Sequence, residues 1–342
     1  MGDQKLAIDR AKIQTELNIA LLSPPEFNDP ALTDCTKNEE ILFATCIAGN
    51  SQKLEELLKD ESFLTTAIEP RRRRFGAYIK DKSNLTAMVS LAIRGGSAQT
   101  TRLVLATAKR HNIPLGQNLI FSSTVDDAVE CGNVDVLKEV ALACPESLNF
   151  GEDKIGFPLC GIVGRSRWSW KKLPLWSEQK EFEYLKVMLE NGADPNGEGL
   201  MVHWPGYYLQ AAAEYSPINI TKLLIQFGAQ VPQSDALQTA VAHNRVDVLE
   251  VLLQHGADVN ERPTEARDAL VYEDLDGDDN EEEQQLSMVP LHYGVRANAH
   301  EATAWLLQHG ADKNIQDARN KSPADYVAEK GDKRMREIFG LE

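Results

Sequence analysis

The sequence predicts an all-α solenoid of about eight helix-turn-helix repeats with loop insertions. Three observations predict it: two segments that align without a gap, an apolar spacing that recurs along the chain, and a glycine turn after many of the recurrences. Residues 237–260 (LQTAVAHNRVDVLEVLLQHGADVN) and 291–314 (LHYGVRANAHEATAWLLQHGADKN) share their apolar positions and both contain LLQHGAD-x-N. Self-similarity of this kind indicates stacked repeats rather than one closed core.

Each repeat is predicted to be a pair of short helices. In residues 237–260, Leu237 and Val241 have helical spacing, a polar turn follows, and Val248 and Leu252 belong to a second helical run. Gly256 is expected to end that second helix, because glycine readily adopts the left-handed conformation at a helix end. One such hairpin cannot bury both of its faces, so each repeat needs a neighbour on either side.

An apolar residue of each first helix is followed fifteen positions later by an apolar residue of the second helix. An eighth pair, Leu159/Met188, fits if fourteen extra residues separate its helices. A single spacing of fifteen would mean little, whereas seven ungapped occurrences indicate a repeat. The ungapped pairs are Leu42/Leu57, Val89/Val104, Val125/Val140, Leu209/Leu224, Leu237/Leu252, Leu291/Leu306 and Ala324/Phe339.

Short motifs at the predicted helix ends resemble those of the ankyrin family, whose repeat of about 33 residues has a T-P-L-H-x-A signature. The resemblance covers roughly Asn38 to Leu341 and is clear from Glu183 onward; the first three repeats lack the Gly-Ala-Asp turn. It implies a concave surface formed by the inner helices and projecting loops. The helix-start motifs are Phe157-Pro158-Leu159, Pro290-Leu291-His292 and Ser322-Pro323-Ala324, and the turns lie at 191–194, 227–229, 255–258 and 309–312.

Breaks in the period divide the chain into four parts. Residues 1–37 are expected to form an N-terminal capping helix and linker, and residues 38–260 to hold the first six repeats. Residues 261–287 contain eleven Asp or Glu and two Arg, a net charge of −9, and predict an acidic, disordered loop. Residues 288–342 are expected to form the last two repeats with a C-terminal cap.

Two further insertions, near 69–82 and 166–180, contain the candidate binding residues. Insertions in repeat folds fall on surface loops and often lie on the binding side. Four consecutive arginines in the first insertion are consistent with an acidic partner, with a nuclear localisation signal, or with a solvated loop. The arginines are Arg71, Arg72, Arg73 and Arg74.

Aromatic residues cluster between the third and fifth repeats. Trp and Tyr are favoured at interfaces because they desolvate large areas around a polar group. Trp168, Trp170 and Trp204, with Tyr207 close behind, are predicted to contact a partner, whereas Trp176 is predicted to pack on the chain itself. Packing on the chain is the alternative for all of these rings.

Composition indicates which classes of partner and which cellular location to expect. The net charge of −16 argues against nucleic acid, because phosphate binding requires a basic surface. No stretch approaches eighteen apolar residues and the N-terminus lacks the layout of a secretory signal, so we expect no membrane contact. The five cysteines are odd in number and lack a C-x-x-C pair, which favours reduced thiols in the cytoplasm, the nucleus or both.

No enzymatic motif is found in the sequence. His300-Glu301 begins like a zinc-protease motif, but Ala304 occupies the place of the second histidine. From Asp274, Gly277 and Gln285 occupy the wrong positions for a calcium-binding loop. We therefore expect no catalytic residue, metal or cofactor. His292, in contrast, is predicted to form hydrogen bonds within the loop framework.

The predicted function is a non-catalytic scaffold or adaptor that binds a partner protein through the concave surface and the inserted loops, in a chain that is monomeric by itself. Two alternatives remain open from the residues. One is a nuclear transcriptional coregulator, which would use the arginine run as an import signal. The other is a regulatory or inhibitory subunit of an enzyme.

Overall fold

The computed structural model describes most of the chain and divides it into two compact units. Unit 1 comprises Met1–Pro158 with Glu190–Ala193, and unit 2 comprises Leu159–Leu189 with Asp194–Glu342. The described residues are 35–75, 78–120, 122–149, 158–163, 176–197, 206–263 and 287–341.

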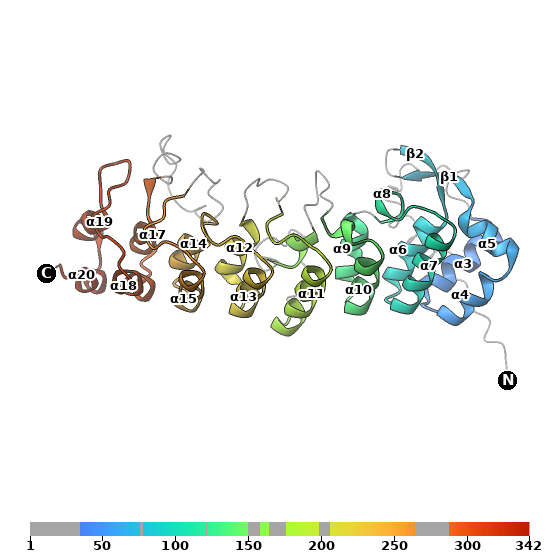
Figure 1. The fold of residues 1–342 in the computed structure, drawn as a ribbon, viewed down its shortest axis with the longest axis horizontal. Helices are drawn as coiled ribbons and strands as arrows, with labels where there is room; N and C mark the ends of the chain where they lie inside the picture. The colour runs from blue at the N-terminus through green and yellow to red at the C-terminus, as the bar shows by residue number, and fades with distance from the viewer. Residues whose placement is uncertain are drawn as a thin grey trace. The chain divides into compact units, whose positions relative to one another are not determined.

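Unit 1 stacks three helix pairs in two layers, which can be followed from blue to green in Figure 1. The first helices α3, α6 and α9 pack side by side, and the second helices α4, α7 and α10 form the other layer. Additional short elements connect the pairs. The bounds are α3 Lys37–Ile47, α4 Ser51–Leu57, α5 Glu61–Ile68, β1 Pro70–Phe75, β2 Tyr78–Ser83, α6 Leu85–Arg94, α7 Ala98–Arg110, α8 Gly116–Leu119, α9 Ser122–Glu130, α10 Val134–Ala143 and η2 Pro145–Asn149.

Unit 2 repeats the same two layers. The first helices α12, α14, α17 and α19 pack in order, as do the second helices α13, α15, α18 and α20 (Figure 1). The bounds are η3 Pro158–Gly161, α11 Glu178–Glu190, α12 Tyr207–Tyr215, α13 Ile218–Gln226, α14 Ala236–Ala242, α15 Val246–Gln254, α17 Pro290–Arg296, α18 His300–Gln308, α19 Pro323–Lys330 and α20 Lys333–Phe339.

The predicted helix pairs are confirmed. Each residue of the fifteen-residue pairs lies in its expected helix, and all but Ala324 are buried, with at most 8% of the residue exposed. Leu159 and Met188 are buried as well, but Leu159 lies in the 3-10 helix η3 rather than in an α-helix. The described part of the fourth repeat therefore begins with one tight turn, which proline at its first position favours.

The glycine turns behave as predicted. Gly192, Gly228, Gly256 and Gly310 all have φ between 90° and 97°, a backbone conformation that side chains with a Cβ rarely adopt. At Gly256 the turn is closed by a hydrogen bond from the Ala257 N–H to the Leu252 carbonyl, which satisfies a group left open at the helix end.

The first insertion differs from the predicted loop. Strands β1 and β2 pair antiparallel over residues 70–75 and 78–83, so the arginine run is strand rather than coil. Arginine and lysine have no strong strand preference, and the pairing depends on contacts that no local pattern reveals. The capping helix expected in 1–37 and the acidic loop expected in 261–287 lie almost wholly outside the described residues.

Candidate partner-binding surface

The four arginines of the first insertion occupy consecutive positions of β1. Their Cα partners in β2 are Lys82 for Arg71, Asp81 for Arg72, Lys80 for Arg73 and Ile79 for Arg74. The structure thus places the predicted arginine run within a strand of a two-stranded hairpin.

Tyr207 is half-buried at the start of α12, beside the fully buried Tyr208. Their ring centroids lie 5.5 Å apart in an edge-to-face arrangement. Gly206, which precedes them, has φ 96°, and a Cβ there would lie 2.5 Å from the Cβ of Ser234. The chain therefore enters α12 through a close backbone approach that only glycine allows.

Of the aromatic residues in and beside the second insertion, Trp176 lies within the described residues. Its ring centroid is 4.6 Å from that of Tyr184 in α11, and Lys180 Nζ lies 4.4 Å from the Trp176 centroid. Trp176 thus packs on its own chain, as predicted. Trp168, Trp170 and Trp204 lie outside the described residues.

Two of the first helices offer almost no accessible surface. No residue from Leu85 to Ile93 of α6 is more than 7% exposed, and none from Ala236 to Val241 of α14 is more than 3% exposed. By contrast, α12 keeps Tyr207, Gln210 and Ala211 partly exposed. Within unit 2, α12 therefore offers more accessible surface in the first-helix layer than α14 does.

The start of the acidic segment is held over α14. Glu261 Oε1 accepts a hydrogen bond from the Gln233 N–H at 2.7 Å, and its carbonyl accepts one from Gln238 Nε2 at 3.3 Å. Arg262 donates to the Gln316 carbonyl at 3.2 Å, in the loop that precedes α19. The third insertion therefore leaves from the side of the inter-repeat loops.

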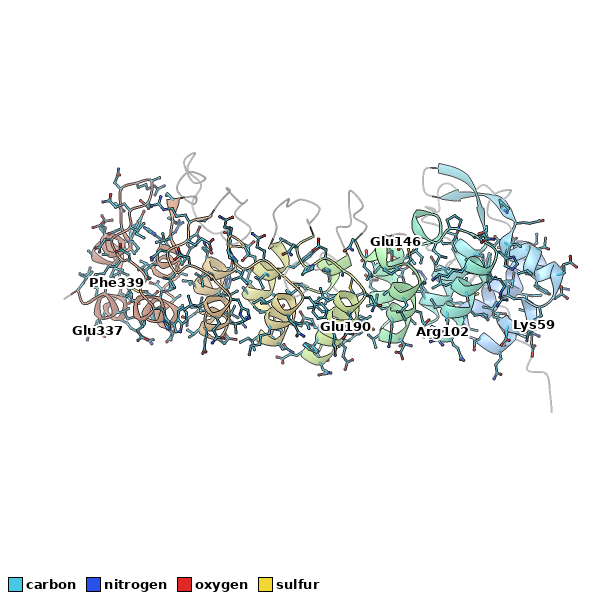
Figure 2. The ribbon with its side chains drawn as sticks, in the orientation of Figure 1. Lys59, Arg102, Glu146, Glu190, Glu337 and Phe339 are labelled. Atoms are coloured by element: carbon cyan, nitrogen blue, oxygen red, sulfur yellow. The ribbon has the colours of Figure 1, made fainter. Side chains whose placement is uncertain are left out.

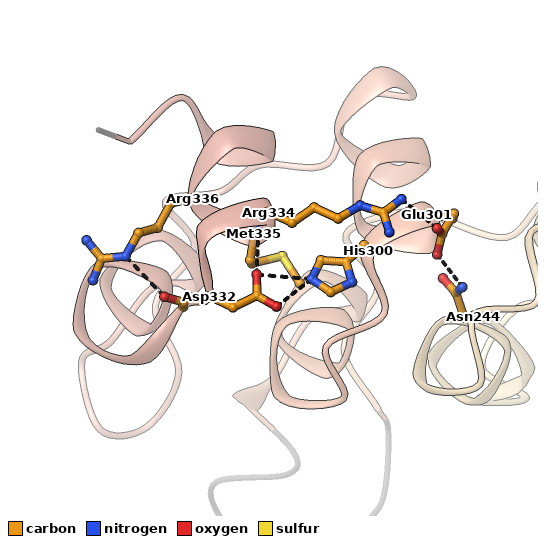
Figure 3. Close-up of polar contacts among 8 residues, drawn as sticks. Asn244, His300, Glu301, Asp332, Arg334, Met335 and Arg336 are labelled. Carbon is orange, nitrogen blue, oxygen red and sulfur yellow. Dashed lines mark hydrogen bonds and ion pairs between the residues drawn. The ribbon is translucent and has the colours of Figure 1, made fainter.

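The turns inside the helix pairs form a chain of polar contacts along unit 2 (Figure 3). Asn244, in the turn before α15, donates to Glu301 and accepts from the Ala302 N–H at the start of α18. Glu301 Oε1 accepts from Arg334 Nη2 of α20 at 2.6 Å. One carboxylate therefore links three successive repeats.

Glu301 and its neighbour His300 both bind residues of neighbouring repeats. The Asn244 amide first, then the backbone and Arg334, hold the pKa of Glu301 at about 2. His300 Nε2 lies 2.8 Å from Asp332 Oδ2, and Asp332 Oδ1 also caps α20 by accepting from the Met335 N–H at 2.7 Å. His300 and Glu301, which resemble the start of a zinc-protease motif in sequence, therefore form contacts between repeats.

Unit 1 joins its repeats in a similar way. Ser97 donates to the Gly49 carbonyl at 3.3 Å, and Asn133 Nδ2 donates to the Gly96 carbonyl at 2.9 Å. On the outer layer, Arg102 of α7 donates through Nε to Glu139 of α10 at 2.8 Å; Figure 2 labels Arg102. The turns within helix pairs are thus used largely for stacking.

Near the start of α17, His292 joins the seventh repeat to the eighth. Its Nδ1 accepts from the Val289 N–H at 3.2 Å, so Nε2 carries the proton and donates to the Lys321 carbonyl at 3.1 Å. Burial first lowers the pKa of this imidazole below 6.5, an effect that the Lys321 carbonyl opposes. The predicted role of His292 in the loop framework is confirmed.

The described part of the chain contains neither a cluster of metal-ligating residues nor a membrane-spanning helix. None of its His, Cys, Asp and Glu residues form a group of three or more that could hold a metal ion. None of its helices is both long and apolar enough to cross a membrane. Cys35, Cys46, Cys131 and Cys144 do not form disulfide bonds, and burial raises the pKa of Cys144 to about 11.

Two layers of short antiparallel helices, joined by left-handed glycine turns, define a helical-repeat solenoid. Sequence comparison then gives the family: residues 175–263 match the model for ankyrin repeats in three copies, and residues 288–318 match the model for an ankyrin repeat. These two matched segments are ankyrin repeats, which are generally protein–protein interaction modules. No curated protein matched the chain in sequence comparison.

The sequence did not indicate the network around Glu301 or the strand pairing of the arginine run. The aligned repeats contain a signal for the first: Asn244 and Asn298 occupy equivalent turn positions, and both have positive φ. No local pattern predicts the strand pairing of the arginine run, because the register places like-charged residues opposite each other, which charge repulsion alone would disfavour.

Proposed function

We propose that this chain is a non-catalytic adaptor or scaffold that binds a partner protein through the inter-repeat loops, the β1–β2 hairpin and half-buried Tyr207 at the start of α12. The match to ankyrin repeats carries the proposal, because these repeats generally act as protein–protein interaction modules. The concave surface that the family resemblance implies would include the same loops.

The distribution of internal contacts supports this choice of surface. The turns within helix pairs are occupied by bonds between repeats, through Asn244 and Glu301 in unit 2 and Asn133 in unit 1. Helices α6 and α14 are buried. Loops between repeats and half-buried Tyr207 are therefore the better candidates for contact with another protein.

Affinity purification with quantitative mass spectrometry tests the proposal. One variant replaces Arg71, Arg72, Arg73 and Arg74 with Ser, a second replaces Trp168, Trp170 and Trp204 with Ala, and a third is Tyr207→Ala. We expect at least one of them to lose partners that the unaltered chain retains, by roughly tenfold or more for a residue at an interface hot spot.

Trp305→Ala is the matched control. Trp305 lies in α18 of the second-helix layer and stacks on His309 with centroids 3.8 Å apart, away from the proposed surface. It should retain every partner. If all three site variants remain folded and retain the full set of partners, these residues do not form the binding surface. Imaging of a fluorescent fusion would check the cytoplasmic or nuclear location that we propose with this function.

A further inference from the structure

The side-chain amide of Asn196 links two successive inter-repeat loops of unit 2. Its Nδ2 donates to the Gly228 carbonyl at 2.8 Å, and its Oδ1 accepts from the Gln230 N–H at 2.7 Å. Asn196 lies in the loop after the fourth repeat, whereas Gly228 and Gln230 lie in the loop after the fifth. One amide group therefore supplies both a donor and an acceptor to the contact between these loops.

Asn196 is also followed by a glycine, Gly197, which is the neighbour that most favours deamidation of an asparagine. In this reaction the backbone nitrogen of the following residue attacks the side-chain carbonyl carbon. The proton of that nitrogen and the side-chain NH2 group leave as ammonia, and a cyclic succinimide forms. Water then opens the succinimide to aspartate or isoaspartate, so no other reactant is needed. Glycine favours the attack because it has no Cβ near its nitrogen and adopts many backbone conformations.

Equivalent asparagines of later repeats have other neighbours. Asn260 and Asn314 occupy the position of Asn196 in the repeated turn, and Asn260 Oδ1 likewise accepts from a backbone N–H of the next loop, at 2.9 Å. They precede Glu261 and Ile315, whose side chains hinder the attack. Of these three asparagines, Asn196 is therefore the one with a reactive neighbour.

The folded turn keeps the reacting groups apart. The Gly197 N–H donates to the Asp194 carbonyl at 3.2 Å, and the Asn196 N–H donates to Asp194 Oδ1 at 2.8 Å. The side-chain amide that would be attacked is held by Gly228 and Gln230. Both sets of hydrogen bonds must break before the Gly197 nitrogen can reach the amide, so the reaction requires local opening of this turn.

We propose that Asn196 is a deamidation site whose reaction follows opening of the turn and then prevents the original contact from re-forming. Aspartate has no hydrogen to donate to the Gly228 carbonyl, and a carboxylate oxygen in place of Nδ2 would be repelled by that carbonyl oxygen. Isoaspartate also lengthens the main chain at this position. The modification adds a negative charge to the inter-repeat loops, and it goes beyond the adaptor function because it needs no partner.

Peptide mapping by mass spectrometry, on the full chain stored at neutral pH, measures the reaction at each asparagine. A synthetic peptide of residues 190–200 gives the rate without the fold. We expect Asn196 to react roughly tenfold or more slowly in the chain than in the peptide, and Gly197→Ala to slow the reaction in the peptide by roughly tenfold or more. Asn260 and Asn314 should remain unmodified over the same period.

Two matched variants test the role of the turn. Asp194→Ala removes the acceptor of the Asn196 N–H but keeps the reacting pair of residues, whereas Asp258→Ala removes the equivalent acceptor of the Asn260 N–H. We expect Asp194→Ala to accelerate the reaction at Asn196 about fivefold, the effect of one lost hydrogen bond on the opening of the turn. Asp258→Ala should leave the rate at Asn196 unchanged.

Asn196→Asp reproduces the aspartate product, so its effect does not depend on the rate of the reaction. Hydrogen–deuterium exchange across residues 228–235 should become roughly threefold faster or more in this variant. Asn260→Asp is the matched control, because it adds the same charge where the bond to the next loop uses the side-chain oxygen, which aspartate keeps. Exchange across residues 310–314 should therefore stay unchanged in the control.

Equal rates at Asn196 in the chain and in the peptide would overturn the proposal, because opening of the turn would then not be required. The same conclusion would follow from an equal rate at Asn260, from no acceleration in Asp194→Ala, or from unchanged exchange across residues 228–235 in Asn196→Asp. The adaptor function is tested separately by the three site variants above, none of which alters Asn196.

Discussion

At the scale of single residues, the backbone conformation of a few glycines decides how closely the repeats approach. Gly206 and Gly228 both have φ 96°, yet their surroundings differ. A Cβ at position 228 would have no atom within 4 Å, whereas one at position 206 would lie 2.5 Å from Ser234 Cβ and 2.8 Å from its Cα. A comparison of substitutions at the two sites therefore distinguishes the cost of a left-handed backbone conformation from the cost of a steric clash.

We predict that Gly228→Ala lowers the free energy of unfolding by about 1–2 kcal/mol, the cost of a left-handed residue with a Cβ. Gly206→Ala should cost a further ~1–3 kcal/mol, because the backbone of Ser234 must move. Urea unfolding followed by circular dichroism measures both. Equal losses in the two variants would contradict the close approach at the start of α12.

Other single residues are occupied by contacts inside the protein. Asn84 is 2% exposed, and its Nδ2 donates to Glu39 Oε1 and to the Thr66 carbonyl, both at 2.8 Å. Two elements of unit 1, α3 and α5, are thereby fixed at the start of α6. A buried carboxylate requires such a donor, since an unpaired one would cost several kcal/mol.

At the scale of elements, the stability of each helix pair depends on its contacts with the next pair. The link from α17 to the loop before α19 passes through His292, which is fully buried as a residue. Its pKa is lowered chiefly by burial, so the folded state favours the neutral imidazole. The unfolded chain therefore takes up this proton at a higher pH than the folded chain does.

The consequence is a pH dependence with a definite sign. Stability from neutral His292 is fully present above the ordinary histidine pKa of about 6.5 and declines as pH falls toward the lower folded value. We predict that His292→Gln loses about 1–3 kcal/mol of unfolding free energy at pH 8 through its buried hydrogen bonds, and a smaller amount at pH 5.5.

Urea unfolding at the two pH values measures this difference, with His309→Gln as the control. His309 is an exposed histidine in the turn after α18, so its replacement should leave the pH dependence close to that of the unaltered chain. If His292→Gln and the unaltered chain lose the same free energy between pH 8 and pH 5.5, the buried imidazole does not contribute as described.

At the scale of the whole molecule, the end of the repeat array is polar. The side chains of Lys333 and Glu337 in α20 are 93% and 65% exposed, whereas Met335 and Phe339 are buried. The last described helix thus exposes charged side chains to solvent and buries its apolar ones. Among the described large apolar residues, Leu142 is the one that is clearly exposed, at 56%.

These features predict a monomer. The net charge of −16 adds mutual repulsion between copies at neutral pH. Size-exclusion chromatography with light scattering at pH 7.5 should give a mass near 38.0 kDa. We expect self-association to increase as pH approaches the isoelectric point near 5.0, where the repulsion is lost. A dimer mass at micromolar concentration and neutral pH would contradict the prediction.

The repeats could be predicted from the sequence by itself, because helix pairing here is local. Leu237 and Leu252 are buried in the two helices of one hairpin, and the spacing of fifteen residues follows from helix period and turn length. The sequence likewise predicts that the second helix ends at Gly256, because the repeated Gly-Ala-Asp turn begins at this residue. Such contacts join residues close in sequence, so the sequence shows them as a repeated pattern of apolar residues.

Only the tertiary structure decided which residues share a surface. Strand pairing made Lys82 and Lys80 the register partners of Arg71 and Arg73. Stacking of repeats brought Glu301 within reach of Asn244 and Arg334, which lie in different helix pairs. These contacts join residues without a fixed sequence spacing, because they depend on where whole elements pack, and no local period records that arrangement.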